Sequence, residues 1–231
     1  MVEKLPPVAR RSFLSHAAVA AVAGAGISAA TPAHAQSANA PFQPARHAED
    51  DWLDLPKGAH RFVVDSSTAD GGGAALLYAS NFFAANKAGY NLDPPSLGIV
   101  VVLRHLSTPF GYTDAMWAKY GEAFSELASF KDPKTKAAPK TNLYNSGDYG
   151  LALANFGNTI PSLVQRNVQF AICNMATRFV AGVIAEKTKG NADAIYRDLS
   201  SNLIANSHLV AAGVVAVNRA QERGYTLLYA G

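Results

Sequence analysis

The sequence has one cysteine, Cys173, among 231 residues. A chain with one thiol cannot form a disulfide within itself. An unpaired thiol is buried and inert, joined to another molecule, or used in chemistry. Its position along the chain leaves these three alternatives open.

Charge is also scarce, because only 16% of the residues are Asp, Glu, Lys or Arg and the formal net charge is +3. That net charge falls to about +1 when residues 1–35 are set aside. The remaining chain therefore lacks the basic surface expected of a nucleic-acid-binding protein. It also lacks an apolar run of the roughly 20 residues that a membrane-spanning helix needs, which predicts no membrane span beyond residue 36.

Signatures of metals and cofactors are absent from the sequence beyond residue 35. Its four histidines are not paired with one another or with acids at the spacing of metal ligands, which predicts no metal site. These histidines are His47, His60, His105 and His208. The glycine run at 71–73 has neither the spacing of a dinucleotide-binding fingerprint nor the Lys-Ser/Thr pair of a P-loop, so we expect no cofactor.

The start of the chain has the features of an export signal. Arg10 and Arg11 are followed by Ser-Phe-Leu, then by an uncharged stretch rich in Ala and Gly over 17–30, and then by Ala-His-Ala at 33–35. A basic segment, a short apolar segment and a small-x-small cleavage site in this order are typical of a twin-arginine signal. We predict a signal peptide over 1–35 and a periplasmic mature protein, with a retained membrane anchor as the alternative.

The other 196 residues have the length of one domain. Residues 36–58 are rich in Ala, Pro, Asn and Gln and predict a linker that ends in a short anchoring turn around Trp52. Residues 59–231 predict one α/β domain. We expect a polar insertion around 128–158, because a loop rich in lysine and proline is followed there by interleaved Asn, Gly, Asp and Tyr.

Apolar periodicity over 59–231 predicts strands that alternate with helices. The strands are expected at 60–65, 97–103, 168–173 and 225–229. The helices are expected at 74–89, 114–127, 160–166, 175–187, 192–203 and 213–223. The unbroken apolar run at 97–103 suits a parallel strand that is covered on both faces. The predicted fold is a three-layer α/β/α sandwich with a mainly parallel sheet of four or five strands.

Cys173 falls where a predicted parallel strand ends and a helix begins with Asn174. Ligands of open α/β folds collect at this edge of the sheet. The free amides and the positive end of the helix dipole would stabilise a thiolate there, and Arg178 lies one turn further along. We therefore consider Cys173 a candidate nucleophile, with Arg178 and His105 as candidate catalytic partners and Asn174 as a candidate ligand-binding residue. A small apolar cysteine buried at a strand end is the alternative.

Two further segments follow predicted strands and are candidates for binding an anion. Arg104 and His105 come directly after the strand at 97–103, so they are expected at the same edge as Cys173. Gly71, Gly72 and Gly73 lie between a strand and a helix, where exposed amides can hold an anion. Solvated loop residues and a tight turn are the respective alternatives.

Several segments together resemble the DsrE/DsrF-like family. They are Val-Val-Leu-Arg-His at 101–105, Phe-Ala-Ile-Cys at 170–173, Leu-Val-Ala-Ala-Gly-Val at 209–214 and Ala-Gln-Glu-Arg-Gly-Tyr at 220–225. The resemblance implies a small α/β/α sandwich that assembles into homo-oligomers. It also implies a cysteine that accepts and passes on persulfide sulfur, at the position of Cys173.

These features give two functional hypotheses. The first is an exported DsrE-like protein whose Cys173 takes sulfane sulfur from a small sulfur-containing anion. The second is a noncatalytic periplasmic module that binds a small anion or assembles as an oligomer, in which the cysteine is structural. The two differ in whether the thiol at position 173 is reachable.

Overall fold

The computed structural model describes residues 42–231, and the predicted signal at 1–35 lies outside the described residues. Residues from Pro44 to Gly231 form one compact unit. This unit holds the helices and strands of the described residues. Within residues 42–231, no helix combines the length and the apolarity needed to cross a membrane.

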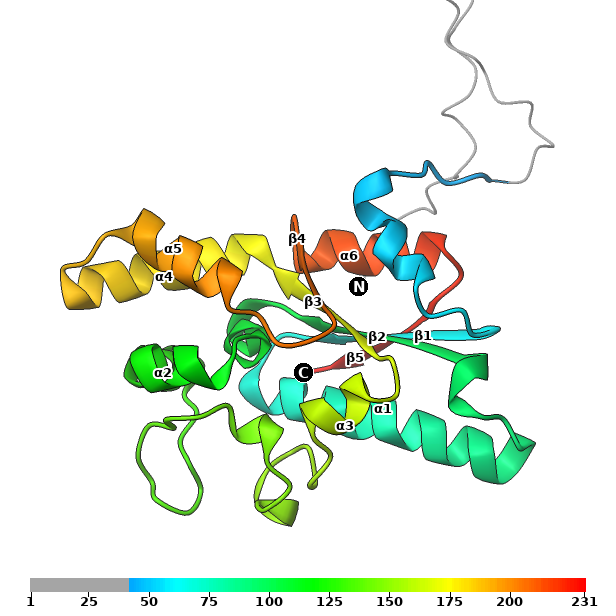
Figure 1. The fold of residues 1–231 in the computed structure, drawn as a ribbon, viewed down its shortest axis with the longest axis horizontal. Coiled ribbons are helices and arrows are strands. Elements are labelled where there is room, and N and C mark those ends of the chain that lie inside the picture. Colours follow the sequence, from blue (N-terminus) through cyan, green and yellow to red (C-terminus); the bar gives the residue numbers. More distant parts are fainter. Residues whose placement is uncertain (1–41) are drawn as a thin grey trace, which may run out of the picture. The chain divides into compact units, whose positions relative to one another are not determined.

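Within the described residues, five parallel strands form one sheet in the order β4-β3-β2-β1-β5 (Figure 1). The strands are β1 (His60–Ser66), β2 (Leu97–Leu103), β3 (Gln169–Cys173), β4 (Ser207–Val210) and β5 (Thr226–Ala230). In the register of the central pair, Val64 of β1 lies opposite Val101 of β2. The predicted three-layer fold with a parallel sheet is confirmed.

The helices of the described residues follow the strands along the chain. The α-helices are α1 (Ala69–Tyr90), α2 (Asp114–Ala128), α3 (Ile160–Val164), α4 (Asn174–Thr188), α5 (Ala192–Ser201) and α6 (Gly213–Glu222). The 3-10 helices are η1 (Ala48–Asp54), η2 (Pro94–Ser96), η3 (His105–Gly111), η4 (Leu143–Asn145) and η5 (Gly150–Ala152).

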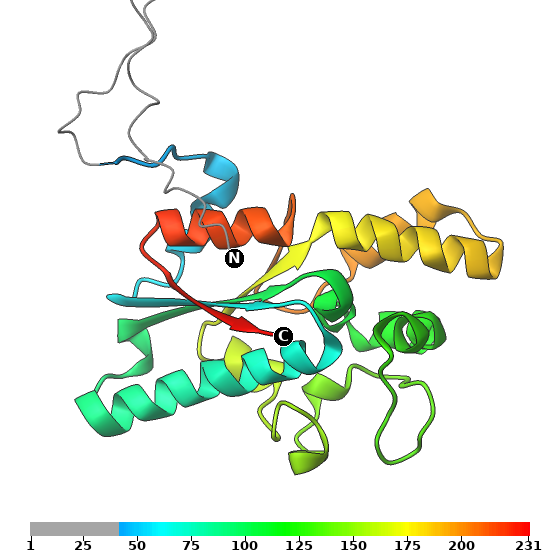
Figure 2. The ribbon, with the colours of Figure 1, turned by 180° about the vertical axis from the view of Figure 1, so that it is seen from behind.

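The two faces of the sheet are covered by different elements. All seven residues of β2 are buried, and they alternate between the faces because successive side chains of a strand point in opposite directions. Val101 belongs to the larger core, to which α1 through α5 contribute, whereas Val100 and Val102 belong to a smaller core with α6 and Leu53 of η1. In Figure 1, α1 and α3 lie below the sheet while α6 and η1 lie above it, and Figure 2 shows the same layers from behind.

The strand order explains why α6 is on its own side. The connections from β1 to β2, β2 to β3 and β3 to β4 all step in one direction across the sheet, so right-handed crossovers place their helices on one face. The connection from β4 to β5 steps back across three strands in the opposite direction. A right-handed crossover in that direction places α6 on the opposite face.

The structure differs from the sequence-based expectation at two elements. Helix α1 begins at Ala69 and not at residue 74, because the Thr68 hydroxyl caps it by accepting a hydrogen bond from the Gly71 amide. The three glycines therefore belong to a helix, although glycine has a low helix propensity. Strand β4 has no counterpart among the predicted strands, since its four residues include Ser207 and His208 and lack an apolar run.

The polar segment at 128–158 contributes to the larger core. Tyr144 is fully buried, and its hydroxyl donates a hydrogen bond to the carbonyl oxygen of Ala69 (2.7 Å). Its ring lies 4.4 Å from that of Phe110, centroid to centroid, and Phe130 packs edge-on against Phe110. The segment is therefore anchored by aromatic side chains beneath its polar surface.

The N-terminal strap, residues 44–58, docks on the side of the sheet that α6 covers. Leu53 is fully buried in the smaller core, and its carbonyl oxygen accepts a hydrogen bond from the Tyr225 hydroxyl (2.6 Å). Trp52 stacks on the ring of His208 in β4. The anchoring turn expected around Trp52 is thus the 3-10 helix η1, and from Pro44 onward the segment predicted as a linker belongs to the compact unit.

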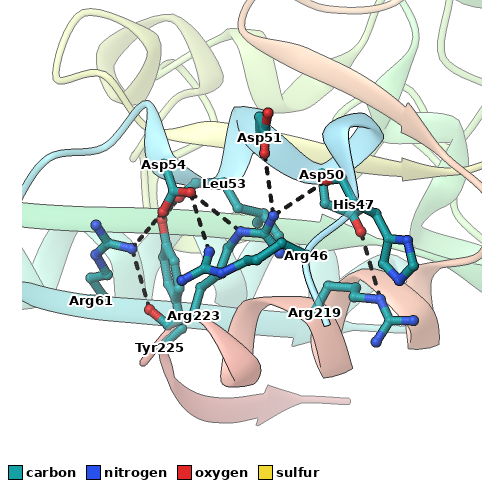
Figure 3. Close-up of polar contacts among 10 residues, drawn as sticks. All are labelled: Arg46, His47, Asp50, Asp51, Leu53, Asp54, Arg61, Arg219, Arg223 and Tyr225. Carbon is teal, nitrogen blue, oxygen red and sulfur yellow. Dashed lines mark hydrogen bonds and ion pairs between the residues drawn. The ribbon is translucent and has the colours of Figure 1, made fainter. Parts of the chain in front are cut away.

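A network of ion pairs holds the strap against β1 and α6 (Figure 3). Three guanidinium groups converge on the Asp54 carboxylate, those of Arg46, Arg61 and Arg223. The Arg223 side chain is only 1% exposed and also pairs with Asp51 at 3.5 Å. Apolar packing of Leu53 and the ion pairs of Arg223 therefore hold the same segment of the strap, since Arg223 lies beneath it.

We expect acid to weaken the strap through Asp54. Burial alone would raise the pKa of Asp54, but the hydrogen bonds from Arg61 and Arg223 outweigh it and lower the pKa below the ordinary value of 3.8. The stabilisation is thus fully present above pH 3.8 and is lost as the pH falls through the lower pKa of the folded state. Asp54 is 44% exposed, so solvent screening limits the effect to about 1 kcal/mol or less.

The free energy of unfolding of the full-length chain and of Asp54→Asn, measured in urea from neutral to acidic pH, checks this expectation. The difference between the two proteins should be constant near neutrality and shrink below about pH 4. A difference that does not change with pH would contradict it.

Candidate functional site

The candidate site lies at the carboxyl ends of β2, β3 and β4. Strand β3 is followed by α4, which packs in the larger core, whereas β4 is followed by α6, which packs in the smaller core. The polypeptide therefore leaves the sheet toward one face after β3 and toward the opposite face after β4. Such a switch point opens a crevice between neighbouring strands, and ligands of open α/β sheets bind there.

A pocket of about 270 Å³ occupies this crevice. Three elements supply its wall: the segment after β2, the start of α4 and the start of α6. Its lining residues are Arg104, His105, Leu106, Cys173, Met175, Ala176, Phe179, Ala212, Gly213 and Val214. The structure thus brings Cys173, Arg104 and His105 together, as their positions after parallel strands indicated.

Cys173 ends β3 and caps α4. Its Sγ accepts a hydrogen bond from the Ala176 amide (3.4 Å), and its carbonyl oxygen accepts one from the Thr177 hydroxyl (2.9 Å). The residue is 7% exposed and lines the pocket. A sulfur atom that accepts an amide hydrogen bond at a helix N-terminus is held where negative charge is stabilised.

A second helix N-terminus reaches the same pocket. Helix α6 starts at Gly213, and its N-cap, Ala212, has no side chain that could accept the first amides. The amides of Gly213 and Val214 at the beginning of a helix have no partner within that helix. The positive ends of the α4 and α6 dipoles therefore meet at the pocket, which favours an anion there.

Arg104 forms one wall of the pocket and is fixed by Asp65 of β1. Its Nε and Nη2 donate to the two carboxylate oxygens of Asp65 at 2.8 and 2.9 Å. These hydrogen bonds raise the pKa of Arg104 above its ordinary value, so it stays charged. Because Asp65 compensates that charge, the electric field that attracts an anion comes chiefly from the helix N-termini. Arg104 serves to orient the bound anion.

Two neighbours of Arg104 leave room for its side chain and support it. A Cβ atom on Gly213 would lie 2.5 Å from the Cβ of Arg104, so only glycine fits there. On the other side the guanidinium lies over the ring of Tyr229, whose hydroxyl is hydrogen-bonded to Ser67 (2.6 Å). The arginine is therefore positioned by β1, β5 and α6 together.

His105 is exposed and lines the pocket beside Arg104. Its φ of 54° is in the left-handed region, which is uncommon for a residue with a side chain. This conformation begins η3 directly after Arg104. His105 therefore contributes to the pocket wall from the first residue of η3.

The mouth of the pocket has an apolar rim, Met175, Phe179 and Val214, whose members are 69%, 58% and 61% exposed. Apolar side chains at the entrance raise the cost of bringing in strongly hydrated ions such as sulfate or phosphate. Softer, less hydrated sulfur anions meet a smaller cost. The entrance of the pocket is therefore apolar, whereas its wall carries the charge of Arg104.

Two residues predicted to act beside the thiol are not among the residues that line the pocket. Arg178 points away from the pocket, since its guanidinium stacks 4.0 Å from the centroid of the Tyr196 ring in α5. Asn174 starts α4 beside Cys173 but is not among the lining residues, and its Oδ1 is buried without a hydrogen-bond partner among the described residues. The prediction that Arg178 assists the thiol is wrong, because one helical turn carries it to the side that faces α5.

The glycine run predicted to hold an anion packs inside the protein instead. Gly71, Gly72 and Gly73 are buried in the first turn of α1, and the amides of Gly71 and Gly72 donate to the hydroxyl and the carbonyl of Thr68. A Cβ on Gly71 would lie 2.4 Å from the carbonyl oxygen of Ala230. The prediction of an open glycine loop is therefore wrong, because close packing accounts for these glycines.

Sequence reasoning missed Asp65, Gly213 and the apolar rim. Asp65 is an acidic residue near the end of an apolar strand, which is a signal that could have been noticed, since a buried acid needs a partner. Gly213 is the first residue of a predicted helix, where its lack of a side chain carries no signal of a close contact with Arg104. The rim residues have the three-to-four spacing of ordinary core residues, so only the fold reveals that they are exposed.

The part of the chain that the structure describes contains no cluster of three or more His, Cys, Asp or Glu that could hold a metal ion. Three hollows larger than the pocket lie away from this chemistry. The smallest of them, of about 300 Å³, lies around Pro94, Pro95 and Arg166, and the other two are about twice its size. One, of about 600 Å³, lies along α2 and α5 around Asp198, which already pairs with Lys119 and Tyr120. The other, of about 590 Å³, lies beside α3 with a mainly apolar wall.

Comparisons with known proteins leave the family open. No family model and no curated protein matches the chain. A solved structure of a protein of unknown function, MTH1491 from Methanobacterium thermoautotrophicum, aligns with 74% of this chain and 98% of its own, at 15% identity and a TM-score of 0.37. A likeness at this TM-score supports no inference about function.

Proposed function

We propose that this chain is an exported DsrE-like protein that takes up sulfane sulfur on Cys173. The observation that carries the proposal is that Cys173 lines a pocket where two helix N-termini and Arg104 meet. The export signal and the resemblance to the DsrE/DsrF-like family belong to the proposal, since both come from the sequence alone.

The chemistry follows from a thiolate in an anion-favouring pocket. The Cys173 thiolate attacks the outer sulfur of thiosulfate, a new sulfur–sulfur bond forms, and the sulfur–sulfur bond of thiosulfate breaks. Its electron pair leaves with sulfite, so a persulfide anion remains on Cys173 and no further oxidant or reductant is needed. A polysulfide reacts in the same way and leaves as a chain shorter by one sulfur atom.

The other pocket groups act on the donor and on the product. The Gly213 and Val214 amides and the Arg104 guanidinium bind the anionic end of the donor. The hydrogen bond from the Ala176 amide (3.4 Å) stabilises negative charge on the Cys173 sulfur. The apolar rim keeps bulk water from a persulfide held in the pocket.

Intact-mass measurement after exposure to thiosulfate or polysulfide tests the proposal. The full-length chain should gain one sulfur atom, about 32 Da, as a persulfide that a thiol reductant removes. Cys173→Ser should gain nothing. Arg104→Met should react more slowly because the donor loses its orienting partner, whereas the matched control Arg178→Ala should react like the unaltered chain.

The proposal is wrong if the unaltered chain gains no sulfur while its thiol reacts with alkylating reagents. In that case the thiol is reachable but does not accept sulfane sulfur.

One observation favours a second function, a noncatalytic small-anion-binding module. Cys173 is 7% exposed and its sulfur serves as the cap of α4, which is a structural role. In this account Cys173→Ala keeps its affinity for a small anion such as sulfite, measured by calorimetry, and loses only helix stability. A loss of sulfur uptake with unchanged sulfite affinity would show that both roles share the pocket.

A further inference from the structure

Strand β5 is the least covered strand of the sheet. It lies at one edge, next to β1 alone. Leu227, Leu228 and Tyr229 are 42%, 40% and 54% exposed. Strands of parallel sheets are normally covered on both faces, so exposed apolar side chains on an edge strand indicate that a neighbour is missing.

Both faces of β5 are uncovered. Leu227 and Tyr229 lie opposite Val63 and Asp65 in the register, on the face that carries α6, because side chains alternate along a strand. Leu228 lies opposite Val64, on the face that carries α1. A single helix docked on one face could not cover both sets, whereas another strand at the edge would extend both faces at once.

The opposite edge of the sheet is protected. Strand β4 has only four residues, includes His208, and is covered there by Trp52 of the N-terminal strap, with the two rings 4.4 Å apart. Short edge strands, polar side chains and a covering segment are the usual protections against pairing between chains. No segment of the described residues covers β5 in this way, and its sequence, Thr-Leu-Leu-Tyr-Ala, lacks charge and proline.

We infer that β5 pairs with β5 of a second copy of this chain, antiparallel about a two-fold axis, so that two five-stranded sheets become one. A strand edge is complementary to itself under a two-fold rotation, because its outward N–H and C=O groups then face each other. The strand carries no charge, so two copies do not repel one another. This inference is independent of sulfur uptake.

The middle residue of β5 fixes the simplest register. An axis beside Leu228 places it opposite Leu228 of the partner subunit, on the α1 face. Leu227 then lies opposite Tyr229 of the partner subunit, on the α6 face. Leucine against leucine and leucine against tyrosine are favourable cross-strand pairs, and the six exposed apolar side chains become covered together.

The pairing reaches the candidate site through Tyr229. Its ring lies under the Arg104 guanidinium, with 5.9 Å between the arginine carbon and the ring centroid. Its hydroxyl is fixed by Ser67. Covering Tyr229 in the interface would immobilise the ring against which Arg104 rests, so assembly would stiffen one wall of the pocket.

A cross-link tests the pairing directly. Residues opposite one another in antiparallel strands have Cα atoms about 4.5–5.5 Å apart, within the range of a disulfide. In the full-length chain with Cys173→Ser, the added change Leu228→Cys should give a disulfide-linked dimer under mild oxidation. The matched control is Leu151→Cys in the same background, at a residue that is 81% exposed. It should stay unlinked.

Sedimentation of the full-length chain completes the test. The unaltered chain should sediment as a dimer at micromolar concentration, and Leu228→Lys should give a folded monomer because two lysines would face each other across the axis. A monomeric unaltered chain would overturn the inference, since residues 1–41 or nothing would then cover the edge. An oligomer that survives Leu228→Lys without cross-linking at Leu228→Cys would overturn it too, because the interface would lie elsewhere.

Discussion

Replacing Gly213 by valine should lower the free energy of unfolding by about 2–3 kcal/mol and distort the pocket wall that Arg104 and the start of α6 form. The first added carbon would lie 2.5 Å from the Cβ of Arg104 and 2.9 Å from its Cδ. The Cβ of Arg104 is close to the backbone and cannot swing aside, so the arginine or the start of α6 has to shift. Sulfur uptake at Cys173 should fall with it.

Urea unfolding and intact-mass measurement on the same preparations check this expectation. The matched control is Gly182→Ala in α4, where an added Cβ meets nothing within 4 Å. That change should be neutral or stabilise the protein by up to about 1 kcal/mol, as glycine-to-alanine changes in helices do. Equal stability for Gly213→Val and the unaltered chain would mean that Arg104 does not occupy the place described.

Removing Arg223 should release the N-terminal strap and lower the free energy of unfolding by about 3 kcal/mol. Arg223 is buried under η1, where it pairs with Asp54 and Asp51. Arg46 contacts the same Asp54 carboxylate, but its side chain is 58% exposed. Arg46→Ala should therefore cost less than about 1 kcal/mol, as exposed ion pairs do.

A third variant separates charge from packing. Arg223→Met keeps most of the buried stem and removes the charge, so its free energy of unfolding should lie between those of Arg223→Ala and Arg46→Ala. Limited proteolysis within 44–58 should follow the same order. If Arg223→Ala and Arg46→Ala were equally stable, the strap would be held by Leu53 and Tyr225 and not by the ion pairs.

The sheet could be predicted because its central strands carry their own signal. The run at 97–103 is apolar at nearly every position, and burial on both faces follows from that pattern alone. Strand β4 could not be predicted, because its four residues, which include Ser207 and His208, carry no apolar pattern. Its stability comes from pairing with β3 and from the stacking of Trp52 in the strap on His208. The start of α1 was misplaced because tight packing against Ala230 and Tyr144 outweighs the low helix propensity of three glycines.

The candidate site was predictable to the extent that it depends on strand ends. Cys173, Arg104 and His105 each follow a parallel strand, so their convergence required only the topology. The partner of Arg104 could not be predicted, because Asp65 meets it only through the register between β1 and β2. Arg178 shows the reverse, because it is close to Cys173 in sequence but its side chain packs against Tyr196 of α5 and not beside the thiol.

The account depends most on the Cys173 sulfur being reachable in the folded protein. The direct measurement is the rate at which iodoacetamide alkylates the single thiol of the full-length chain, followed by mass, as urea is raised toward the unfolding transition. If the thiol reacts from the native state, the rate stays nearly constant until the transition begins. A rate that rises from the start in proportion to the unfolded fraction would show that the sulfur is closed off in the folded protein, and the proposed sulfur uptake would be contradicted.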